Sequence, residues 1–156
     1  MVDNNLFIVF NNSSSLHQFD CTSFHQLSEI TVEGLRRPSD MVYCSDDSQL
    51  YIADCDCIWR VSTTPPHRSD HWLSTADIPD VGRLSVTSHY LLMTSQHGGV
   101  RQYDTVDARL MRVVWFPTFM KVLWHAVESD RGTFIVCHQG TLQERTKFAV
   151  SIIYNI

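Results

Sequence analysis

PSDMVYCSDDSQLYIADCDCIWRVS, residues 38–62, is the stretch that decides the fold of this chain. Its first apolar run, Met41–Cys44, ends in four polar residues that favour a turn, and the second, Leu50–Ala53, ends in Asp-Cys-Asp. The third, Ile58–Val61, is followed by Ser-Thr-Thr-Pro-Pro. Short β-prone runs separated by such turn residues predict three strands. The stretch has no room for crossover helices, so the strands are expected to pair as an antiparallel meander.

The middle run of this stretch recurs along the chain. Runs of similar character end in Asn11, Asp54, Ser95 and His138, which are 43, 41 and 43 positions apart. A second series, with spacings of 41 and 38, consists of Pro38, Pro79 and Pro117. A period of about 40–45 residues built from about four short strands is the signature of a β-propeller. The sequence therefore predicts an all-β protein, a β-propeller segment of antiparallel four-stranded blades, in preference to an irregular β-sandwich.

The central stretch also resembles an NHL-type repeat, in which a Pro-led strand, an acidic turn, a "YVAD"-like strand and a strand with Ile, Arg and Val follow one another. The matching residues are Pro38, Tyr51, Ile52, Ala53, Asp54, Ile58, Arg60 and Val61. Later units keep the strand order but have Ser95 and His138 in place of the Asp. The WD repeat is a poorer match, because no Gly-His pair opens a unit and no Trp-Asp pair closes a strand. The resemblance implies a propeller that binds protein or, in some relatives, RNA.

The repeat divides the chain into four units within one propeller segment, residues 1–156. The expected units are 5–33 (partial), 38–76, 81–116 and 120–156 (partial). The first lacks its innermost strand and the last lacks its outermost strand, so the two do not complete one shared blade. Propellers avoid exposed edges by closing a ring. We therefore expect an incomplete ring, which is either a piece of a longer propeller or self-associates with another copy through its open blade faces.

Composition narrows the function classes. The chain has 156 residues, is 44% hydrophobic and carries a formal charge of −5. That charge argues against a nucleic-acid surface, which needs clustered Lys and Arg. The N-terminal apolar run is too short for a signal peptide or membrane span. Five cysteines without framework spacing favour free thiols in a reducing compartment, so a cytoplasmic location without membrane association is expected.

Two clusters have residue types that bind metals. His67 and His71 are four residues apart, but no helix is predicted there, and on a strand they would lie about 13 Å apart at about 3.3 Å per residue. We therefore interpret them as part of a solvated outer strand. Cys55 and Cys57 lack the second pair that a tetrahedral site needs, so we interpret the cysteines as small buried fillers. No metal and no cofactor is expected.

Catalytic signatures are absent: the sequence has neither a Gly-rich phosphate loop nor a Gly-x-Ser-x-Gly elbow. The chain is therefore predicted not to be an enzyme but a protein-interaction scaffold. One alternative is a propeller hydrolase or lyase with a metal near the central axis, for which the innermost strands offer Asp40, His125 and Glu128. Another is a truncated copy without independent function.

The candidate contact surface is the rim on which the repeated strands end, because equivalent positions in successive blades are expected on one face. Its residues, with those of the neighbouring turns and links, are Asn11, Arg36, Arg37, Asp54, Ser95, His97, Phe119 and His138. Arg beside aromatic residues is typical of protein interfaces. The polar residues at strand ends have a second interpretation, the capping of backbone amides in turns.

Overall fold

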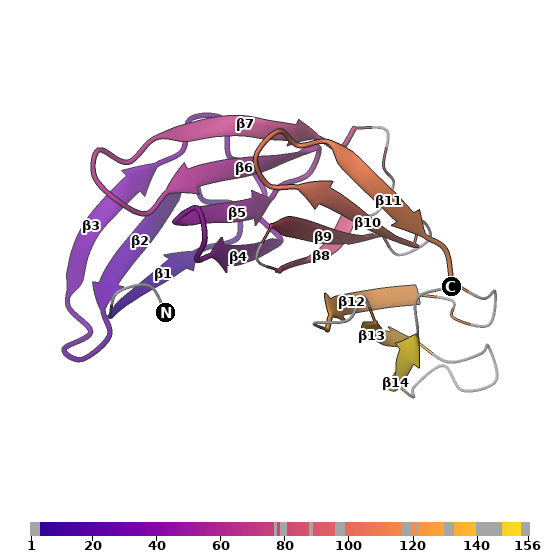
Figure 1. Ribbon diagram of the computed structural model, residues 1–156. Coiled ribbons are helices and arrows are strands. Elements are labelled where there is room, and N and C mark those ends of the chain that lie inside the picture. The colour runs from indigo at the N-terminus through magenta and orange to yellow at the C-terminus, as the bar shows by residue number, and fades with distance from the viewer. Residues whose placement is uncertain are drawn as a thin grey trace. The chain divides into compact units, whose positions relative to one another are not determined.

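The structure is a computed structural model. It describes residues 4–76, 78, 81–87, 89–95, 99–116, 120, 122–129, 133–139 and 148–153, the last range as backbone alone. The chain divides into two compact units, Met1–Ser74 and Thr75–Ile156, each of which is considered by itself. The regular structure of the described residues consists of β-strands (Figure 1). No helix in this part of the chain is long and apolar enough to cross a membrane.

The first unit contains two antiparallel sheets. The first sheet has the order β1-β2-β3 and the second has the order β4-β5-β6-β7. Their strands are β1 (Asn5–Val9), β2 (Ser15–Asp20), β3 (Gln26–Thr31), β4 (Asp40–Cys44), β5 (Gln49–Ala53), β6 (Cys57–Ser62) and β7 (Ser69–Ser74). Within each sheet, every strand pairs with the next one along the chain, which is the expected meander.

The second unit also contains two antiparallel sheets. The third sheet has the order β11-β10-β9-β8 and the fourth has the order β12-β13-β14. Their strands are β8 (Val81–Val86), β9 (Tyr90–Ser95), β10 (Gly99–Asp104), β11 (Leu110–Val114), β12 (Val122–Glu128), β13 (Phe134–Gln139) and β14 (Phe148–Ile153). The prediction of an all-β fold of antiparallel sheets is confirmed.

The core of the first unit lies between its two sheets. Phe7, Leu16 and Ile30 of the first sheet form one buried cluster with residues of the second sheet, including Leu50 and Ile52. Side chains alternate between the two faces of a strand. Because Phe7 faces the second sheet, Leu6 and Ile8 lie on the opposite face of β1. Phe10 follows the strand, and its ring contacts His17, the partner of Ile8 on that face.

The core of the second unit lies between the third and fourth sheets. Leu92 and Val100 of the third sheet cluster with Leu123, Phe134 and Val136 of the fourth.

A hydrogen bond and an ion pair also join the third and fourth sheets. The buried Ser85 hydroxyl donates to the Ala126 carbonyl at 2.6 Å. The Arg112 guanidinium pairs with the Glu128 carboxylate and lies 4.8 Å from the centre of the Phe134 ring. These polar contacts between sheets require one specific alignment of the two sheets, which apolar packing alone does not impose.

Candidate functional site

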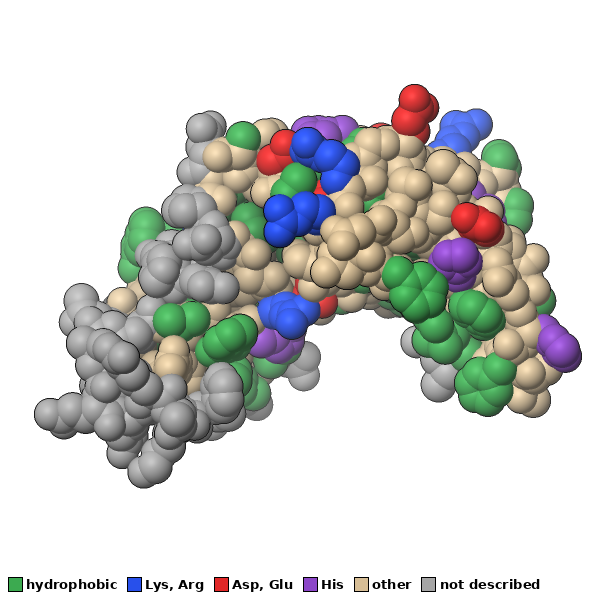
Figure 2. Space-filling view, turned by 180° about the vertical axis from the view of Figure 1, so that it is seen from behind, with side chains coloured by type: hydrophobic (Ala, Val, Ile, Leu, Met, Phe, Trp, Pro, Cys, Tyr) green, Lys and Arg blue, Asp and Glu red, His purple; other side chains and the backbone are tan. Residues whose placement is uncertain are grey.

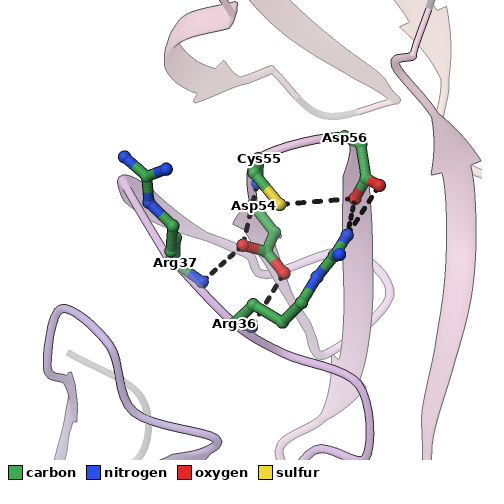
Figure 3. A network of polar contacts seen from close by, with 5 residues as sticks. All are labelled: Arg36, Arg37, Asp54, Cys55 and Asp56. Atoms are coloured by element: carbon green, nitrogen blue, oxygen red, sulfur yellow. Dashed lines mark hydrogen bonds and ion pairs between the residues drawn. The ribbon is translucent and has the colours of Figure 1, made fainter.

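The candidate site is the link that precedes β4 together with the turn between β5 and β6. Asp54 directly follows β5, and its N–H donates to the Cys57 carbonyl at 2.9 Å, which closes the turn. The Asp54 carboxylate accepts hydrogen bonds from the backbone amides of Arg36 at 2.9 Å, Arg37 at 2.7 Å and Cys55 at 2.8 Å (Figure 3). One carboxylate therefore joins two chain segments almost twenty positions apart.

Asp54 is held ionised in this position. The side chain is buried, with 3% of the residue exposed. Burial on its own raises the pKa of a carboxyl group, but hydrogen bonds from the amides of Arg37, Cys55 and Arg36 outweigh it, and the pKa of Asp54 lies below its ordinary value. The negative charge is thus used to fix the backbone of the link, and we name residues Arg36–Arg37 and Asp54–Asp56 the stapled loop.

The two arginines of the stapled loop differ in their surroundings. A terminal nitrogen of Arg36 donates to both carboxylate oxygens of Asp56 at 2.6 Å, and both side chains are about half exposed, at 59% and 49%. The hydrogen bond to Arg36 is the main reason why the pKa of Asp56 is lowered. The exposed Arg37 side chain extends away from both carboxylates in Figure 3. The loop therefore presents one guanidinium toward solvent on a fixed backbone.

The remaining residues of the predicted rim have diverse environments. Ser95 and His138 are buried, with 0% and 4% exposed, whereas Asn11 is exposed in the turn between β1 and β2. Leu6 and Ile8 alternate along one face of β1 as Leu50 and Ile52 do along one face of β5. In this alignment the counterpart of Asp54 is Phe10, not Asn11. His97 and Phe119 lie outside the described residues. Asp54 has the capping role that sequence analysis gave as the second interpretation.

The two clusters with metal-binding residue types do not converge on one point. His67 Nδ1 lies 3.0 Å from the Ser62 carbonyl oxygen, whereas the His71 ring lies edge-on to Trp59 with ring centres 5.7 Å apart. Cys57 is buried, and burial is the main cause that raises its pKa to about 12, but Cys55 is exposed. Our interpretation of the cysteines as buried fillers therefore fits Cys44 and Cys57 and is wrong for Cys55.

Glu128, which was considered as a ligand of an axial metal, is bound by other side chains. Glu128 accepts hydrogen bonds from Gln102 at 2.8 Å and from Arg112, so both of its oxygens are engaged. Within the described ranges, no three His, Cys, Asp or Glu side chains are grouped as metal ligands would be.

The sequence analysis missed Asp56 as the partner of Arg36, although two basic residues and an Asp-Cys-Asp turn in one repeat unit are a usable signal. It also missed the Arg112–Glu128 pair, whose members come from different repeat units.

Comparison with known proteins found similarity in structure alone. Neither protein-family models nor curated protein sequences gave a match. Among solved structures, the hydrazine synthase of Kuenenia stuttgartiensis is similar over 96% of this chain, with a TM-score of 0.70 and 14% identity. The β-propeller domain of Cps50 (Swd1) from Myceliophteria thermophila is similar over 98%, with a TM-score of 0.67 and 11% identity. The computationally designed Ika4 protein is similar over 99%, with a TM-score of 0.62 and 9% identity.

These similarities establish β-propeller-like sheets as the fold of the chain. At such low identity they carry no activity from one protein to the other. This chain spans 42% of the hydrazine synthase chain, 51% of the Cps50 chain and 88% of the Ika4 chain.

Proposed function

We propose that this chain is a non-catalytic protein-interaction scaffold of the β-propeller type, with NHL-like repeats, and that the stapled loop is its contact site. The observation that carries the proposal is the Asp54 carboxylate, which binds the amides of Arg36 and Arg37 from a buried position. A backbone held in this way loses little conformational entropy when a partner binds, which favours affinity.

The chemistry of the loop indicates a partner with carboxylate groups. A guanidinium presents its donors in a fixed, planar arrangement that matches a carboxylate with two hydrogen bonds. Arg37 offers such a group to solvent, and Arg36 adds a second one whose ion pair with Asp56 is exposed and therefore weak. The whole chain has a formal charge of −5, which favours a protein partner over nucleic acid.

The test is quantitative capture of proteins from a lysate of the source cells on the immobilised chain. The wild-type chain is compared with Arg37→Glu and with the control Arg109→Glu, which reverses an exposed arginine in the other unit. Circular dichroism spectra of all three establish that they are folded. We expect proteins that the wild-type chain and Arg109→Glu retain and that Arg37→Glu loses at least tenfold. Identical sets for the three chains would refute the assignment of the stapled loop.

A further inference from the structure

The first sheet has an apolar face that is partly exposed. It is formed by Leu6, Ile8, Phe10, His17 and Phe19, because Ile8 pairs with His17 and Leu6 pairs with Phe19 across β1 and β2. The ring of Phe10 lies 5.4 Å from that of His17, which lies 6.5 Å from that of Phe19, so the three form a row. Phe10 is 55% exposed. We name this surface the open face of the first sheet.

Hydrophobic side chains are visible on this part of the surface. In Figure 2, the half turn from Figure 1 brings the first sheet to the right, where several of them gather beside a histidine. Phe10 is exposed and the other residues of the open face are partly buried, whereas Leu50 and Ile52 of the second sheet are only 2% and 0% exposed.

The first unit itself shows what covers a face of this kind. Leu50 and Ile52 occupy the positions on β5 that Leu6 and Ile8 occupy on β1. They pack against the first sheet, on the face that presents Phe7 and lies opposite the open face. The second unit repeats the arrangement, since Phe134 of the fourth sheet packs against Leu92 of the third. In both units, the covering surface belongs to the face that a sheet turns toward the next sheet along the chain, and we call this its later face. The surface that fits the open face is therefore the later face of another propeller-type sheet.

The fourth sheet carries an exposed later face. Val127 and Ile135 are paired across β12 and β13, and they lie opposite the buried Ala126, Phe134 and Val136. They are 36% and 38% exposed. These two residues define the exposed face of the fourth sheet. One chain thus has both halves of a sheet-to-sheet contact, on its first and its last sheet.

We propose that the open face of the first sheet binds the exposed face of the fourth sheet from a second copy of this chain. Two different surfaces meet, so the contact is heterologous, and it ends in a closed assembly or extends as a chain of copies. A second copy is the occupant we infer because the described part of this chain carries both surfaces. The contact uses neither arginine of the stapled loop and goes beyond the proposed function.

The test is the molar mass of the purified chain, measured by light scattering after size-exclusion chromatography over a hundredfold range of concentration. Phe10→Asp introduces a charge on the open face, Ile135→Asp does so on the exposed face of the fourth sheet, and the control Val106→Asp changes an 83% exposed residue of the β10–β11 turn. We expect wild type and Val106→Asp to assemble, and each of the other two variants to weaken self-association at least tenfold. A wild-type chain that is monomeric throughout would overturn the proposal.

Mixing the two interface variants tests that the contact is heterologous. Phe10→Asp keeps an intact fourth sheet and Ile135→Asp keeps an intact first sheet, so an equimolar mixture is expected to form pairs that neither variant forms alone. Recovery on mixing also shows that both variants are folded. A mixture that remains monomeric would refute the contact, as would an assembly that both variants retain. Arg37→Glu is expected to assemble as wild type does, which separates this proposal from the proposed function.

Discussion

Asp54 is predicted to be the main polar contributor to the stability of the first unit. Asp54→Ala removes three hydrogen bonds from a carboxylate that is 3% exposed. Hydrogen bonds to charged groups contribute about 1.5–3 kcal/mol each, and part of that is regained when water reaches the freed amides of an exposed loop. We therefore expect the free energy of unfolding of the first unit to fall by about 2–4 kcal/mol.

The assay is equilibrium unfolding in urea at pH 7, followed by tryptophan fluorescence, together with amide hydrogen exchange. The amides of Arg36, Arg37 and Cys55 are expected to be protected in the wild-type chain and to exchange rapidly in Asp54→Ala. The control is Asp56→Ala, which removes an exposed ion pair with Arg36 that contributes at most about 1 kcal/mol. Equal effects of the two substitutions, or a loss below about 0.5 kcal/mol for Asp54→Ala, would refute the reasoning.

The same carboxylate predicts a dependence on pH. The pKa of Asp54 in the folded state is lowered from an ordinary value of 3.8, so the unfolded chain binds its proton more readily. The stability that Asp54 contributes is therefore complete above pH 3.8 and is lost as the pH falls through the folded-state pKa. The difference in free energy of unfolding between wild type and Asp54→Ala should shrink over that range, and a constant difference would contradict an ionised Asp54.

Three further substitutions and a labelling experiment test other parts of the structure. Glu128→Ala leaves the half-buried Arg112 without its carboxylate, and urea unfolding should show a loss of about 2–3 kcal/mol in the second unit. Gly34→Ala should lower the free energy of unfolding by about 1–3 kcal/mol, because Gly34 has φ +98° and a Cβ would lie 3.0 Å from the Trp59 ring. Ala108→Gly should raise the free energy of unfolding by about 0.5–1 kcal/mol in thermal unfolding, since Ala108 has φ +59°. A lower free energy of unfolding in this variant would contradict the conformation of the β10–β11 turn. Iodoacetamide should modify Cys55 before Cys44 and Cys57, as peptide mass spectrometry can show, because only Cys55 of these three is exposed.

The sequence was sufficient to predict the all-β fold and the position of the strands in the central unit. The runs expected at 41–44, 50–53 and 58–61 are observed as β4, β5 and β6, with ends that differ by at most one residue. This is possible because strand breaks depend on local turn residues such as Asp54-Cys55-Asp56, and because a recurring period is visible without any tertiary contact.

The phase of β1 and the partners of the charged residues were decided by the tertiary structure. Comparing run ends made Asn11 the counterpart of Asp54, but the pairing of β1 with β2 and the packing of Phe7 place Phe10 in that phase. A shift of one residue moves every side chain of a strand to the other face, and apolar residues at 6 to 10 in succession leave the phase open. The Asp54 contacts with Arg36 and Arg37 likewise join positions far apart in the chain. Local sequence determines where strands begin and end, whereas the face each side chain takes follows from which strands pair and which sheets pack together.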